Sequence, residues 1–108
     1  MKLIKSIIRP DKVDAVKDAI SPFATGVTVT EVRGHGKQKG HTAIYRGAEY
    51  QISLLPKMEI DVVVSDDVVD DVVKAIILHA RTGEIGDGRV FVIPVERSYR
   101  IRTGELEP

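Results

Sequence analysis

The chain has 108 residues, of which 43% are hydrophobic, and this is enough for one modest core and too little for two. Sixteen lysine and arginine residues offset sixteen aspartate and glutamate residues, and aromatic side chains are few, so we do not expect a nucleic-acid partner. The absence of cysteine excludes disulfides and thiolate chemistry.

The beginning of the chain and its hydropathy indicate a cytoplasmic protein. Lys2 and Lys5 bring charge too early for a signal peptide. No apolar run approaches the roughly 20 residues of a membrane helix. We therefore expect a single domain over residues 1–108, in the cytoplasm and without membrane insertion.

The two halves of the sequence repeat each other at an offset of 56 positions. The shift places Ile4 on Ile60, and likewise aligns further apolar residues, Val16 with Val72 and Ile20 with Ile76. In each half a short β-branched run is followed by a polar break and then by apolar residues at helical spacing. Each half therefore predicts a strand and then a helix, and Gly83 is a plausible stop for the second helix.

A further β-rich segment follows each predicted helix, at residues 27–33 and 90–95. Two strand-helix-strand units in tandem form the βαββαβ ferredoxin-like pattern, an α+β fold. We expect an antiparallel sheet with both helices on one face. The opposite face would carry Lys5, Ile7, Asp61 and Val63, which either self-associate or leave Lys5 and Asp61 paired on a solvated surface.

Residues 34–57 interrupt this pattern and are longer than the roughly 12–15 residues usual for loops in a small domain. The segment is rich in apolar and basic side chains, which could form a hairpin or an ordered protrusion. A binding arm is one interpretation. A hairpin packed on its own domain is the other.

Three segments favour an anionic ligand. Residues 34–40 combine glycines with two lysines, residues 81–89 are basic and glycine-rich, and Arg100 and Arg102 would share one side of an extended segment. An ordinary turn and a solvated surface are the alternatives for the last two. Together the three segments make a polyphosphate the leading hypothesis.

Other chemistries are less well supported. His35, His41 and His79 are not spaced as zinc ligands. The expected central strands lack the aromatic residues of RNA-recognition modules. A small phosphohydrolase or phosphotransferase, using His41 or Arg9, is the alternative function, but no nucleophile and base pair stands out.

From Met1 to about Glu105 the chain resembles the PII nitrogen-regulatory proteins. The resemblance is carried by residues 38–42, 45–50, 81–83 together with 86–92, and 100–104. It implies a regulator and not an enzyme, a homotrimer of ferredoxin-like subunits that binds ATP or ADP between neighbours. It also implies a protruding T-loop at 34–57, a B-loop at 81–89 and a C-terminal segment at 95–108.

The resemblance assigns roles to individual residues. Those expected around the phosphates in one subunit are Gly34, Gly36, Lys37, Gln38, Gly86, Asp87, Gly88 and Arg89, joined by Arg100 and Arg102 of the next subunit. Thr28 and Val63 would lie near the base and ribose. The effector 2-oxoglutarate would bind beside ATP through Mg²⁺, with Gln38 and Lys57 contacting the metal or the effector.

The T-loop is the expected output of this sensor. Tyr50 lies where relatives are nucleotidylated, whereas Ala48 excludes the serine phosphorylation found in others. Arg46 is expected to enter a transporter pore. The partners implied are an ammonium transporter, glutamine synthetase or its regulators, or a sensor kinase. Lys37 and Glu84 depart from the family pattern, which bears on the preference between ATP and ADP.

Overall fold

The secondary structure follows the order that the repeat predicts. A computed structural model describes residues 1–24, 26–35, 42–45, 48–51 and 54–107. The two strand-helix-strand units are β1 (Lys2–Ile8), α1 (Val13–Ile20) and β2 (Thr28–Gly34), then β5 (Leu55–Val64), α2 (Val69–Ala80) and β6 (Gly88–Pro94). Single 3-10 turns, Pro10–Lys12 and Asp66–Val68, precede the two helices at equivalent positions of the repeat.

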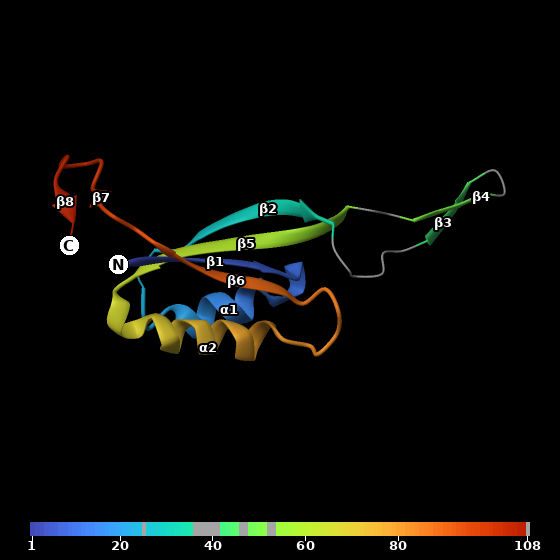
Figure 1. The fold of residues 1–108 in the computed structure, drawn as a ribbon, viewed down its shortest axis with the longest axis horizontal. Helices are drawn as coiled ribbons and strands as arrows, with labels where there is room; N and C mark the ends of the chain where they lie inside the picture. Colours follow the sequence, from blue (N-terminus) through green and yellow to red (C-terminus); the bar gives the residue numbers. More distant parts are fainter. Residues whose placement is uncertain (25, 36–41, 46–47, 52–53, 108) are drawn as a thin grey trace.

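The central sheet has the strand order β2-β5-β1-β6, and every neighbouring pair is antiparallel. Both helices cover one face of this sheet, and the other face carries no helix (Figure 1). Strands β1 and β5, which begin the two halves of the repeat, lie side by side at the centre. The predicted ferredoxin-like α+β fold is therefore confirmed.

The core lies between the sheet and the helices and is built from the repeat. Ten apolar side chains are buried there: Ile4, Ile8, Val16, Ile20, Ile60, Val62, Val64, Val72, Ile76 and Ala80. Residues at the 56-position offset occupy equivalent places, since Ile4 and Ile60 are both fully buried, as are Val16 and Val72. Burial of these matched side chains supplies the main stabilisation of the fold.

The second helix ends earlier than the glycine pattern suggests. It stops at Ala80, because Arg81 adopts an extended backbone conformation and its N–H closes the last turn on the Ile77 carbonyl at 3.0 Å. Gly83 therefore lies in the following loop and is not the helix stop.

A hairpin interrupts the connection between the two units, from β2 to β5. Strands β3 (Thr42–Tyr45) and β4 (Ala48–Gln51) pair with each other, and they lie well beyond the ends of β2 and β5 (Figure 1). The predicted hairpin is confirmed, and the alternative of a hairpin packed on its own domain is wrong. Lys57 belongs to β5 and not to the connection.

The carboxyl-terminal segment forms a second small hairpin. Strands β7 (Ser98–Tyr99) and β8 (Leu106–Glu107) lie at the opposite end of the molecule from β3 and β4 (Figure 1). Our prediction of an extended Arg100–Arg102 segment is wrong, because residues 101–103 form a turn. The Gly104 N–H donates to the Arg100 carbonyl at 2.7 Å, and Gly104 has a φ of 70°, which favours glycine.

In the part of the chain that the structure describes, no helix is long and apolar enough to cross a membrane.

Candidate functional site

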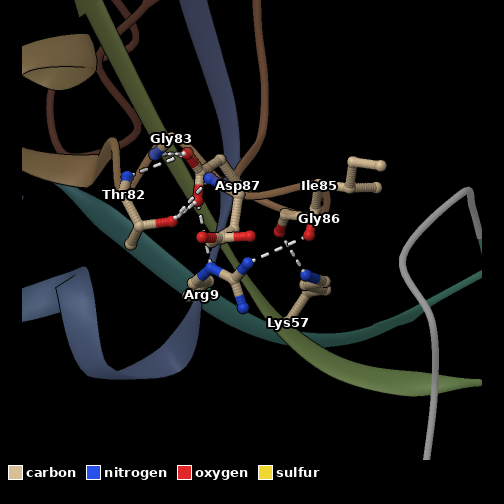
Figure 2. A network of polar contacts seen from close by, with 8 residues as sticks. Arg9, Lys57, Thr82, Gly83, Ile85, Gly86 and Asp87 are labelled. Atoms are coloured by element: carbon tan, nitrogen blue, oxygen red, sulfur yellow. Dashed lines mark hydrogen bonds and ion pairs between the residues drawn. The ribbon is translucent and has the colours of Figure 1, made fainter.

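The loop over residues 81–89 is organised around the carboxylate of Asp87 (Figure 2). Its Oδ2 accepts hydrogen bonds from the backbone N–H groups of Thr82 and Gly83, each at 2.8 Å. Its Oδ1 accepts one from Arg9 Nε at 3.1 Å and another from the Thr82 hydroxyl. Arg9 also donates through Nη2 to the Ile85 carbonyl at 3.1 Å. The loop is thereby fixed to the end of β1.

These contacts keep Asp87 ionised. The Thr82 hydroxyl is the largest cause of a pKa far below the usual range, and the backbone N–H groups and Arg9 lower the pKa further against the effect of burial. Because its lone pairs already face these donors, the carboxylate acts on the loop and not directly on a bound anion. Arg9 offsets its charge, which would otherwise repel an anion.

We expect this network to make the protein less stable in acid. A carboxylate with a depressed pKa contributes stability that is fully present above its unfolded pKa of about 3.9 and is lost as the pH falls through its folded pKa. Urea unfolding at a fixed protein concentration measures this loss. Asp87→Asn should lose less stability than the wild type as the pH falls. Asp70→Asn, on the exposed face of α2, is the control. Equal pH slopes in wild type and Asp87→Asn would contradict the assignment.

Lys57 joins the same loop from β5. Its Nζ donates to the Gly86 carbonyl at 2.6 Å, and the residue is only 9% exposed (Figure 2). Burial lowers the pKa of this ammonium, and the charge of Arg9 lowers it further, while Asp87 opposes the shift. Gly34, at the end of β2, lies against the Lys57 side chain, where a Cβ would be 3.5 Å from Lys57 Cγ. A cation is thus held between the loop and the base of the inserted hairpin.

Gly88 fixes the point where the loop becomes strand β6. It pairs with Ile8 of β1, and its φ is 106°. A Cβ at this position would lie 1.7 Å from the Ile7 carbonyl oxygen. Only glycine fits both the conformation and the space. Arg89, the next residue, is paired with Ile7 and so lies on the face of the sheet opposite the helices.

Clefts lie at both ends of the sheet. One of about 330 Å³ lies beside the loop, between α2 and β6, and its lining includes Ile77, Arg81 and Arg89. Another of about 280 Å³ lies at the end where β7 and β8 are found, and its lining includes Val63 and Ser98. Each end therefore offers a surface on which a further group could bind.

The expected site residues divide between these two ends. Lys57 and the loop residues Gly86–Arg89 lie with Gly34 at one end. Val63 pairs with Leu3, which is five residues along β1 from Ile8, or about 17 Å. Thr28 pairs with Asp61, which lies opposite Lys5 in the middle of β1. Arg100 and Arg102 belong to the hairpin beyond that far end. One copy of the chain therefore does not bring all these expected residues together.

Other predicted residues lie outside the part that the structure describes. They are Gly36, Lys37, Gln38, His41 and Arg46. Tyr50 is placed through its backbone in β4, opposite Ala43.

The sequence interpretation missed the structural role of Arg9, which it considered only as a catalytic residue. The repeat contains no clear signal for this role, because Arg9 aligns with Ser65 but neighbouring positions, such as Pro10 and Asp66, also differ between the two halves. Thr82 was likewise treated as part of a basic loop and not as a partner of Asp87.

A metal site does not arise from the described side chains alone. Among them, no group of three or more histidine, aspartate or glutamate residues is placed to hold an ion. The carboxylate of Asp87, in the glycine-rich loop, already accepts hydrogen bonds from Arg9 and from the backbone N–H of Thr82. A Mg²⁺ ion would therefore need oxygens from a bound ligand, with Gln38 as the candidate protein ligand.

The fold and the loop define a ferredoxin-like domain with a basic, glycine-rich loop suited to an anion. Comparison with known proteins gives the family. The model for "Nitrogen regulatory protein P-II" matches residues 1–105. The chain belongs to the P-II family, and is accordingly a signal-transduction protein of nitrogen regulation and not an enzyme.

Curated relatives agree over nearly the whole chain. Nitrogen regulatory protein P-II 1 of Escherichia coli K12 is 57% identical over 106 residues, which cover 97% of this chain and 95% of the relative. The P-II proteins of Klebsiella oxytoca and Haemophilus influenzae are 57% and 55% identical with the same coverage.

Proposed function

We propose that the protein senses ATP and ADP in sites completed by two neighbouring copies of a homotrimer. The division of the expected site residues between the two ends of one copy supports this most directly. Neighbouring copies could bring the loop end of one chain against the Arg100–Arg102 hairpin of the next. A closed ring of three such contacts would complete three sites.

The accessible apolar surface favours self-association. On the sheet face opposite the helices, Val63, Phe91 and Ile93 are 46%, 40% and 37% exposed. Ile101, in the turn of the carboxyl-terminal hairpin, is fully exposed. Contiguous apolar surface of this kind commonly marks a protein interface.

The phosphates would be held by backbone N–H groups of the glycine-rich loop and by guanidinium groups. Gly86, Gly88 and Arg89 supply these from one copy, together with the Gly34–Gln38 segment. Arg100 and Arg102 approach from the other copy. Arg100 Nε now bonds Glu107 Oε1 at 2.6 Å, so a bound phosphate would compete with this exposed ion pair.

The effector 2-oxoglutarate would bind next to Mg-ATP. Lys57 would exchange the Gly86 carbonyl for a carboxylate of the effector, and Gln38 would contact the metal. Because Lys57 then releases the loop, ATP with 2-oxoglutarate and ADP would favour different arrangements of residues 34–57. A phosphohydrolase is disfavoured, since Arg9 is bonded within the loop and the family is regulatory.

The inserted β3–β4 hairpin would carry the output to protein partners in the cytoplasm. Its position beyond the sheet leaves it accessible (Figure 1). Candidate partners are an ammonium transporter, glutamine synthetase or its regulators, and a sensor kinase. Arg46 would contact a transporter, and Tyr50 would be the residue modified by nucleotidylation.

Isothermal titration calorimetry tests this proposal. The protein is titrated with Mg-ATP and with ADP, each with and without 2-oxoglutarate. We expect both nucleotides to bind and 2-oxoglutarate to bind only with Mg-ATP. Failure of both nucleotides to bind would overturn the sensor proposal, and binding of 2-oxoglutarate without ATP would overturn the proposed effector site.

A further inference from the structure

The sheet face turned away from the helices carries a small polar cluster of Lys5, Glu59 and Asp61. Lys5 lies on β1 and the two acids on β5, and they alternate along their strands with residues of the core, so all three side chains share the helix-free face. The Lys5 Nζ lies 4.0 Å from Glu59 Oε2. The Lys5 and Glu59 side chains are 35% and 19% exposed, so the cluster is already partly buried in a single copy.

Asp61 has an oxygen that lacks a hydrogen-bond donor. Its Oδ1 is shielded from solvent, and no group in the described part of the chain donates to it. Lys5 is directly opposite Asp61 in the strand register, yet its ion pair is with Glu59. A buried acceptor without a donor is unfavourable. The Glu59 carboxyl, two residues along the same face of β5, can supply the donor when it is protonated.

The electrostatics of Glu59 agree with a shared proton. A hydrogen bond with Asp61 is the first cause that raises the pKa of Glu59, followed by burial and the Asp61 charge, and Lys5 opposes the shift. Two further cations share this face, Lys57 on β5 and Arg89 on β6.

Strand β2 contributes no charge next to the cluster. Its residues opposite Asp61 and Glu59 are Thr28 and Thr30. The helices pack on the other face of the sheet (Figure 1). The charge state of the cluster therefore depends mainly on its own three residues and on whatever covers the face.

We propose that the Lys5–Glu59–Asp61 cluster takes up one proton per copy when self-association buries this face of the sheet. The inference rests on the self-association proposed above. With both carboxylates ionised, two negative charges and one positive charge leave each cluster at −1. One shared proton makes it neutral and satisfies the Asp61 oxygen. Burial of several like-charged clusters near one another would otherwise oppose assembly.

The sign of the pH dependence follows from this uptake. Burial in the assembly raises the pKa of Glu59 above its value in a free copy. Association therefore strengthens as the pH falls from the pKa of Glu59 in the assembly towards its pKa in a free copy. Below both values the association is independent of pH. Within that window the association constant should change by about tenfold per copy for each pH unit.

The experiment measures the urea concentration at which the assembly dissociates, by analytical ultracentrifugation across a pH series. Wild type should dissociate more readily as the pH rises. Glu59→Gln removes the titrating group and should dissociate at the same urea concentration at every pH. Lys5→Met removes the cation that opposes protonation of Glu59. The pH range over which dissociation becomes easier should therefore lie higher than in wild type. Glu31→Gln, on the helix-side face of β2 and exposed, is the matched control and should behave as wild type.

The outcomes separate the two proposals. If wild type assembles with no pH dependence, or if Glu59→Gln keeps the wild-type dependence, the proton inference is overturned while the homotrimer stands. If wild type is a single copy at every pH, the homotrimer is overturned together with the inference.

Discussion

Replacing Gly88 by alanine should lower the free energy of unfolding by roughly 2–6 kcal/mol, because it combines a strained backbone with a steric clash. The φ of 106° disfavours a side chain, and the new Cβ would lie 1.7 Å from a backbone oxygen of β1, which cannot move without disturbing the central sheet. Urea unfolding followed by circular dichroism measures the loss.

Gly83→Ala is the matched control for this change. Gly83 also has a positive φ, 92°, but a Cβ there would meet nothing within 4 Å. It should therefore show the cost of conformation without the clash, about 1–2 kcal/mol. Equal losses in the two variants would contradict the close approach of Gly88 to β1.

Replacing Lys57 by methionine should weaken the binding of Mg-ATP with 2-oxoglutarate by about 10- to 150-fold, if charge-assisted contacts contribute about 1.5–3 kcal/mol each. The buried ammonium is held beside the glycine-rich loop, where it could receive a carboxylate. Titration calorimetry of 2-oxoglutarate into the Mg-ATP complex gives the affinity.

Lys74→Met, on the exposed face of α2, is the control and should leave the affinity unchanged. Circular dichroism establishes that both variants are folded. A folded Lys57→Met protein that responds to 2-oxoglutarate as wild type does would remove Lys57 from the effector site.

The architecture could be predicted because the same pattern is present twice. The matched pairs Ile4 with Ile60 and Val16 with Val72 are buried in equivalent positions, so the core follows from hydrophobic periodicity alone. Strand and helix order follow from the same repeat. The hairpin within residues 34–57 was open to two interpretations, since apolar side chains alone do not say whether they pack on the domain.

The organisation of the site depends on contacts that sequence spacing does not reveal. Arg9 and Asp87 are far apart in the chain and meet only because β1 and β6 are neighbours in the sheet. The turn at Arg100–Arg102 depends on Gly104 and a local hydrogen bond, whereas the residue pattern suggested an extended segment. Composition predicted an anion site, but it could not show that the expected residues lie at two ends of one copy.

The most direct test of a site shared between copies is complementation between two defective variants. Arg89→Gln impairs the loop, and Arg100→Gln with Arg102→Gln impairs the hairpin, so each protein alone should lose most ATP binding. Chains refolded together at equal concentration should recover about a quarter of the sites, those that join an intact loop to an intact hairpin of the next copy. Mixed assemblies that form but recover no binding would contradict the shared site.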